Sequence, residues 1–167
     1  PGDERVVIGG YESGVDACVN LARAGKKVTV LASTPTWNVQ TPDPSTELAP
    51  YTAERLREVM SPGFPGPTPE LLAPLRVLRV EEASGGGVNG VAAWKKRETP
   101  LRPEGSLRTP FEGAAPPGAA GSELVVHTNQ PPVLCTGFEG SVAAIGRDLF
   151  DLADDSGTGC IAGAPLL

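Results

Sequence analysis

The first thirty residues combine two short apolar runs with one amphipathic stretch. Arg5–Ile8 is apolar after its first position and leads straight into a glycine-rich turn, while Lys27–Leu31 has the β-branched composition of a buried strand. Between them, Ser13–Ala24 places its apolar residues at helical spacing and is followed by Gly25, a common helix stop. The pattern predicts a strand, a glycine turn, a helix and a second strand.

The rest of the chain is patterned mainly as strands. After a loop rich in proline and threonine, Thr52–Met60 has the spacing of a second helix, and Leu75–Glu82 alternates apolar and charged residues as a half-buried strand does. Residues 98–122 are rich in Gly, Pro and Ala without a usable period and predict a loop. Further strands are predicted at Val88–Arg97, at Glu123–His127 and within PPVLCTG (131–137), then a helix at Ser141–Leu152 and an irregular tail at 153–167.

The order of these elements determines the fold class. It is β-α-β-α-β, followed by a meander and one more strand, and no internal repeat is visible. Parallel strands need long crossovers, and helical crossovers cover the faces of the sheet. We therefore predict an α/β fold: a Rossmann-like parallel sheet with helices on both faces and an antiparallel β-meander flap.

Composition narrows the class of partner. The net charge is −6 and the 14 Lys and Arg are scattered, so the chain lacks the basic stripe of a nucleic-acid surface. No apolar run approaches the roughly 20 residues of a membrane helix, and the charged start PGDERVV does not have the pattern of a signal peptide. We expect a cytoplasmic protein that binds neither nucleic acid nor membrane.

The three cysteines, Cys18, Cys135 and Cys160, have no C-x-x-C spacing. This pattern indicates a reducing compartment and supplies neither a metal site nor a redox dithiol. Cys18 falls in the first predicted helix and Cys135 ends a predicted strand, so both are expected to be small core residues.

The turn GGYESG at residues 9–14 differs from the dinucleotide-binding pattern G-x-G-x-x-G at one position. Gly9 and Gly14 match the first and third glycines, Gly10 lies between them, and Tyr11 replaces the second, which normally lets pyrophosphate approach the backbone. The helix that follows offers free N–H groups to phosphates. The surrounding elements still predict a nucleotide site, against a degenerate turn kept only for the fold.

Two further residues of the turn act in opposite directions. Glu12 adds negative charge beside the expected phosphate path, whereas Ser13 can cap the helix or donate a hydrogen bond to a phosphate.

The segment after the second strand bears on the choice of nucleotide. An acidic residue would grip a ribose 2′-hydroxyl there, but residues 32–36 read ASTPT and contain no carboxylate. The hydroxyls of Ser33, Thr34 and Thr36 leave room for a 2′-phosphate, which favours NADPH with NADH as the alternative. No arginine lies in this segment, and Lys26 and Lys27 are at the wrong end of the strand.

Other chemistry-bearing residues have structural explanations. His127, the single histidine, ends a strand and is expected at the surface, and Trp37 and Trp94 are expected to pack rather than stack on adenine. Asp151, Asp154 and Asp155 lack clear ligand spacing. No catalytic acid–base pair and no metal site is predicted.

Two motifs together resemble a known family. VVIGGYESGVDA, followed by a strand ending in VTVL, looks like the pyridine-nucleotide half of two-dinucleotide-binding flavoproteins, the group of thioredoxin reductases, bacillithiol-disulfide-reductase-like proteins and flavin-containing monooxygenases. PVLCTGF (132–138) is similar to the segment that leads back toward the flavin domain in these enzymes. The resemblance covers residues 6–138.

The resemblance implies an excised piece of an FAD-dependent oxidoreductase. Residues 1–152 would be its NAD(P)H-binding domain and residues 153–167 the return toward a missing FAD-binding domain of the same chain, and the missing initiator Met agrees with this. The activity implied is hydride transfer from nicotinamide to flavin, to an electron acceptor that stays open. The domain would not be active alone, and its uncovered interface makes a homodimer an expected alternative state.

The resemblance also implies roles for residues of this chain. The turn at residues 9–14 would cradle the pyrophosphate, Ser33, Thr34 and Thr36 would meet the adenosine ribose, and Thr136, Gly137 and Phe138 would line the nicotinamide side. The chain departs from thioredoxin reductases in having no C-x-x-C, which argues against a direct dithiol role. Two alternatives remain: a nucleotide-sensing or scaffold module, and a methyltransferase-like fold, which usually has an acidic residue after the second strand.

Overall fold

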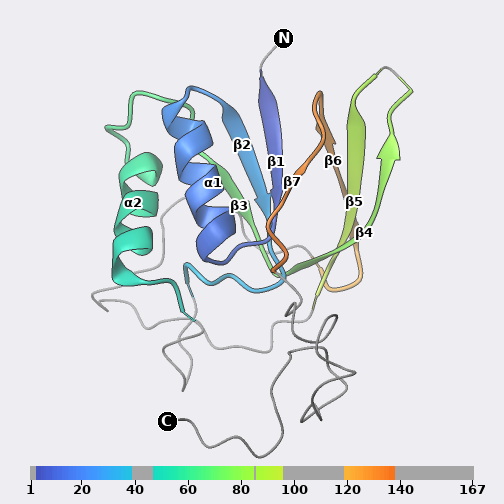
Figure 1. Ribbon diagram of the computed structural model, residues 1–167. Helices are drawn as coiled ribbons and strands as arrows, with labels where there is room; N and C mark the ends of the chain where they lie inside the picture. The colour runs from blue at the N-terminus through green and yellow to red at the C-terminus, as the bar shows by residue number, and fades with distance from the viewer. Residues whose placement is uncertain (1–2, 39–46, 85, 96–118, 138–167) are drawn as a thin grey trace, which may run out of the picture. The chain divides into compact units, whose positions relative to one another are not determined.

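The computed structural model describes residues 3–38, 47–84, 86–95 and 119–137. The chain forms two compact units, Pro1–Thr136 and Gly137–Leu167, and every described helix and strand belongs to the first. In chain order these elements (Figure 1) are β1 (Glu4–Ile8), α1 (Glu12–Arg23), β2 (Lys27–Leu31), α2 (Pro50–Met60), β3 (Glu70–Leu72), β4 (Leu75–Glu82), β5 (Val88–Trp94), β6 (Glu123–Thr128) and β7 (Val133–Leu134).

The first sheet is parallel, with the strand order β3-β2-β1-β7. The chain builds outward from β1 to β2 and β3 through α1 and α2, and β7 then adds to the other side of β1. The order therefore reverses between β1 and β7. In open α/β sheets, the crevice at the carboxyl ends of the strands beside such a reversal is the usual ligand site.

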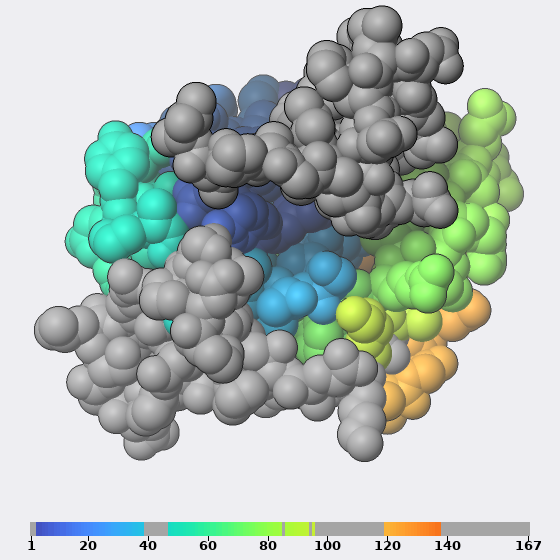
Figure 2. Space-filling view, turned by 60° about the horizontal axis from the view of Figure 1, so that its bottom comes forward, coloured from blue at the N-terminus to red at the C-terminus, as the bar shows by residue number. Residues whose placement is uncertain are grey.

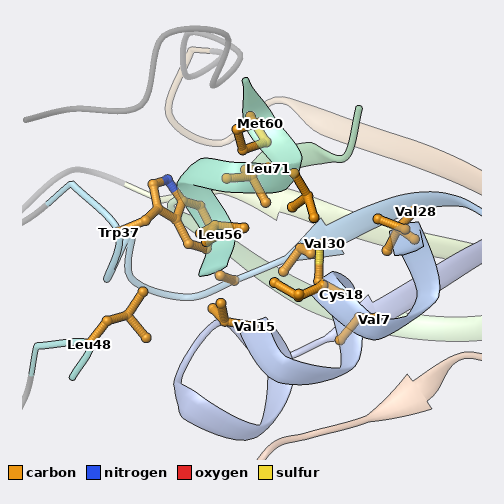
Figure 3. Packing of buried hydrophobic residues seen from close by; sticks show 14 of the residues in the cluster. Val7, Val15, Cys18, Val28, Val30, Trp37, Leu48, Leu56, Met60 and Leu71 are labelled. Carbon is orange, nitrogen blue, oxygen red and sulfur yellow. The ribbon is translucent and has the colours of Figure 1, made fainter. Parts of the chain in front are cut away.

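Both described helices cover the same face of this sheet. The buried positions of α1 follow helical spacing, with Val15, Cys18, Val19 and Ala22 on one side. They pack with Leu56 of α2 and with alternate residues of β1 and β2 in one cluster (Figure 3). This cluster is the main core. Fully burying a side chain of the size of Leu56 in it stabilises the fold by about 1.5–3 kcal/mol.

The antiparallel sheet β4-β5-β6 covers the opposite face. Val6 and Ile8 of β1, which alternate with Val7, pack there against Leu75 and Ala92. A register shift between Val77 and Arg79 bends β4 as a bulge does. The hydroxyl of Thr128 donates to the carbonyl of Glu4 at 3.0 Å and ties β6 to β1.

The structure confirms the predicted α/β fold with a parallel sheet and a meander. Of the two faces expected to carry helices, α1 and α2 occupy one, and the meander covers the other within the described residues. The third parallel strand is β3, only three residues long, which the sequence pattern did not predict. β4 instead pairs antiparallel with β5 and opens the meander.

Some predictions fall on parts of the chain outside the described residues. These are the helix at 141–152, the tail at 153–167 with the boundary before it, and most of the loop at 98–122; of that loop, residues 119–122 form a turn closed by a 3.0 Å hydrogen bond from Ser122 N to Ala119 O. β5 ends at Trp94, earlier than the predicted end at Arg97. Within the described part, neither helix has the length and apolarity that crossing a membrane requires.

Candidate functional site

The candidate site lies at the carboxyl ends of the parallel strands. The glycine turn follows β1, Ser33 and Thr34 follow β2, and Cys135 and Thr136 follow β7. Figure 2 shows this end of the unit, where the light-blue segment after β2 adjoins the yellow-green end of β5. The topology thus brings together three segments that are far apart in the sequence.

Close backbone contacts explain the first and last glycines of the turn. Gly9 has φ +115°, and a Cβ on it would lie 2.1 Å from the carbonyl oxygen of Cys135. A Cβ on Gly14 would lie 2.0 Å from the carbonyl oxygen of Gly9. The first glycine lets the turn approach β7, and the last lets α1 begin directly against the turn.

Gly10 is required by packing beneath the turn. A Cβ there would lie 2.3 Å from Cβ of Ala32 and 2.9 Å from Cζ3 of Trp37. Trp37 is 4% exposed and belongs to the main core, which confirms it as a packing residue. The buried hydroxyl of Thr36 donates to the carbonyl of Gly10, so Thr36 faces the turn from inside the protein.

Tyr11 occupies the second glycine position without backbone strain. Its φ of −98° is open to any residue, and 43% of the residue is exposed. As the N-cap of α1 it makes no side-chain capping hydrogen bond. The first bond of the helix runs from Val15 N to Tyr11 O at 2.9 Å, so the N–H groups of the first turn have no acceptor within the helix.

Glu12 is directed toward α2. Its carboxylate accepts a hydrogen bond from Ala49 N at 2.5 Å and another from the hydroxyl of Thr52. Ala49 is the N-cap of α2 and has no side-chain oxygen of its own, and Glu12 accepts the N–H of this N-cap residue from another helix. The carboxylate of Glu12 is thereby engaged at the start of α2, while the N-terminus of α1 is not capped by its own N-cap residue.

The segment after β2 is held by backbone hydrogen bonds to the β3–β4 connection. Ala32 N donates to Leu72 O at 2.9 Å, and Leu75 N donates to Ala32 O at 2.8 Å. Ser33, next in the chain, is exposed, and Thr34 is partly exposed. These two hydroxyls lie at the surface, in contrast to Thr36.

The end of β7 contributes Cys135 and Thr136. Cys135 N donates to Ile8 O at 2.7 Å, and its backbone contacts Gly9. Sequence reasoning placed Cys135 in the core, and the structure shows it half-buried and packed on the core beside the turn. Thr136 is exposed, as is Gly137 with φ +94°, while Phe138 lies outside the described residues.

The remaining candidates lie away from the turn. His127 is exposed on β6 with Nδ1 3.0 Å from Oδ1 of Asn89, which confirms the predicted surface position. Cys18 is buried in the main core, and burial raises the pKa of its thiol to about 12, so it is unreactive. No group of three metal-ligating side chains occurs among the described residues. The side chain of Trp94, together with Asp151, Asp154, Asp155 and Cys160, lies outside them.

The amino ends of the strands carry paired charges. Lys26 pairs with Asp3, Arg5 with Asp3 at 2.7 Å and Lys27 with Glu4 at 2.9 Å. Hydrogen bonds from Lys26 and Lys27 lower the pKa of Asp3 and of Glu4 respectively. A cavity of about 340 Å³ opens at this end between the parallel sheet and β6, with Glu4, Lys27 and Glu70 in its lining.

Comparison with known families agrees with this geometry. Residues 1–72 match the family model described as pyridine nucleotide-disulphide oxidoreductase. The matched stretch ends at Leu72, the last residue of β3, and so contains the whole β-α-β-α-β unit with the glycine turn. The amino-terminal part of this chain is therefore similar to the pyridine nucleotide-disulphide oxidoreductases.

Proposed function

We propose that this chain binds a pyridine nucleotide, NADPH in preference to NADH, at the carboxyl ends of β1, β2 and β7. In this proposal it is the NAD(P)H-binding domain of an FAD-dependent oxidoreductase and presents the nicotinamide to a flavin domain of the same protein. The observation that carries the proposal is the α1 N-terminus, uncapped by Tyr11, at the point where the strand order reverses. The family match over the same elements supports it.

The residues present fit a dinucleotide. The free N–H groups at the start of α1 and the exposed hydroxyl of Ser13 would hold the pyrophosphate, with the Tyr11 ring beside it. Ser33 and Thr34 would meet the adenosine ribose, and Thr136 would meet the nicotinamide. When bound, the nicotinamide supplies the hydride, and the protein supplies its position.

Glu12 does not oppose this arrangement. A carboxylate in the first turn of α1 would repel a phosphate if it faced the ligand. Both of its oxygens accept hydrogen bonds from the start of α2 instead. In the proposal Glu12 is therefore a positioning residue, which holds the start of α2 against α1 and does not contact the pyrophosphate.

A scaffold or nucleotide-sensing module is the second candidate function. Tyr11 favours it, because a side chain stands where the dinucleotide motif normally has none. A scaffold would keep Gly9, Gly10 and Gly14, since packing alone requires all three. A scaffold differs from the proposed domain in not binding a dinucleotide, whereas a sensing module would bind one without taking part in hydride transfer.

Calorimetric titration of the folded chain with NADPH and with NADH separates them. We expect binding of both, tighter for NADPH. Ser13→Glu, which places an exposed carboxylate at the phosphate position, should abolish binding, while Asn20→Glu near the other end of α1 should not. Failure of the wild-type chain to bind either dinucleotide, with a native circular dichroism spectrum, would favour the scaffold.

A further inference from the structure

Two basic residues of the meander lie beside the end of β2. Arg76 directly follows Leu75, whose N–H donates to Ala32 O at 2.8 Å, and Ala32 is the residue before Ser33. Lys95 N donates to Pro74 O at 2.9 Å, which brings the end of β5 to the same connection. Both residues are exposed. The fold thus brings the backbone of two basic residues close to the end of β2, where the sequence after β2 has no cation.

These two cations differ from all the other lysines and arginines that the structure describes. The structure describes nine lysines and arginines in all, and seven of them take part in an ion pair, namely Arg5, Arg23, Lys26, Lys27, Arg55, Arg57 and Arg79. Arg76 and Lys95 are the other two. Unpaired basic side chains near each other raise the positive potential and attract an anion.

Among the described residues, the carboxylate in register with Arg76 across the meander does not neutralise these cations. Glu123 of β6 is opposite Ala93 of β5, which is opposite Arg76 of β4. Glu123 is therefore two strands away from Arg76, a separation of about 10 Å at the usual strand spacing. No ion pair joins Glu123 to a basic residue within the described part of the chain.

We propose that Arg76 and Lys95 bind the 2′-phosphate of NADPH, together with the hydroxyls of Ser33 and Thr34. This inference rests on the proposed function, because it assumes that the adenosine ribose lies at the end of β2. The phosphate is then bound from the meander and not from the loop after β2. A guanidinium and an ammonium donate charge-assisted hydrogen bonds to phosphate oxygens, and the two exposed hydroxyls add neutral donors.

The test removes the two charges without touching the glycine turn. Arg76→Gln and Lys95→Gln, singly and combined, are titrated with NADPH, NADH and adenosine 2′,5′-bisphosphate. Each hydrogen-bonded charge contributes on the order of 10-fold in affinity, so each single variant should bind NADPH about 10-fold more weakly. NADH binding should stay unchanged, and the double variant should lose its preference for NADPH.

Matched controls come from the same strand and from the opposite end of the sheet. Arg79→Gln removes a charge of β4 that is paired with Glu81, and Lys27→Gln removes one paired with Glu4. Neither should change the affinity for any of the three ligands. Because all these side chains are at the surface, the circular dichroism spectra should match that of the wild type, and the melting temperature should change only slightly.

The outcomes separate the inference from the proposed function. Wild-type NADPH preference in the double variant would overturn the inference while leaving the dinucleotide site standing. A wild-type chain that prefers NADH would overturn the inference and the cofactor preference together. A chain that binds neither dinucleotide but binds the bisphosphate through Arg76 and Lys95 would support the phosphate site alone and contradict the proposed function.

Discussion

The two ends of the parallel sheet use charge in opposite ways. At the amino ends of β1 and β2, Asp3 and Glu4 pair with Lys26 and Lys27 in neighbouring positions. At the carboxyl ends the structure presents backbone N–H groups, hydroxyls and the unpaired cations of the meander. Paired charges stabilise the sheet at its amino ends, whereas the donors at the carboxyl ends have no partner within the described residues.

The difference follows from chain direction. In a parallel sheet joined by helices, every strand ends where the next helix begins, so free helix N–H groups gather at the carboxyl ends. The amino ends instead receive the last turns of the helices, where basic residues are favourable, as Arg23 in the last turn of α1 illustrates. Polarity of the backbone thus separates the end that we propose to bind the dinucleotide from the end that carries paired charges.

The largest expected effect is at the glycine turn. Gly9→Ala places a Cβ 2.1 Å from the Cys135 carbonyl oxygen at φ +115°, so both backbone strain and steric overlap oppose the fold. We expect a loss of about 3 kcal/mol or more in the free energy of unfolding. Chemical denaturation followed by circular dichroism measures it.

Gly63→Ala is the matched control, because a Cβ there meets nothing within 4 Å and the residue has no positive φ. It should change stability by less than about 0.5 kcal/mol. Equal stability of Gly9→Ala and Gly63→Ala would show that the turn does not approach β7 as closely as the structure places it.

An intermediate effect is expected for the link between the two helices. Glu12→Ala removes the acceptor for Ala49 N and for the hydroxyl of Thr52 at the start of α2. The free energy of unfolding should fall by about 1–2 kcal/mol. Urea denaturation measures this, with Glu54→Ala as the control, since that exposed carboxylate only pairs with Arg57 within α2.

The same variant also tests whether Glu12 affects dinucleotide binding directly. If Glu12 only supports α2, dinucleotide affinity of Glu12→Ala should change little at temperatures where the variant is folded. Marked tightening of NADPH binding would show that its charge does reach the phosphate path, and the assignment of Glu12 to α2 would be wrong.

The local sequence pattern was sufficient to predict most helices and strands, but it was not sufficient to predict the candidate site. β2 and β4 have the predicted bounds because their β-branched or alternating residues span five and eight positions. β3 was missed because three residues after a proline-rich stretch carry no period. The sequence could not show that Arg76 and Lys95 come near the end of β2. Only the backbone hydrogen bonds of the folded chain bring the meander to the end of this strand.

The smallest expected effect is at the amino ends, where Lys27→Gln should slightly lower the melting temperature at neutral pH. Its partner Glu4 has a pKa lowered from 4.5, mainly by the hydrogen bond from Lys27, so its stabilisation is present above pH 4.5 and is lost as the pH falls through the lowered value. The pKa of Lys27 is raised from 10.5 by Glu4, so its stabilisation is lost as the pH rises through the raised value. The difference between variant and wild type should therefore be greatest between these limits.

The dependence on salt concentration tests whether Lys27 stabilises the fold through its ion pair with Glu4. Both side chains are solvated, so raising the salt concentration toward 1 M should screen the pair and remove the difference in melting temperature. A difference that survives both high salt and acid would mean that Lys27 contributes through packing against the cavity at this end. In that case the amino ends would no longer be held by paired charges alone, and the contrast with the carboxyl ends would weaken.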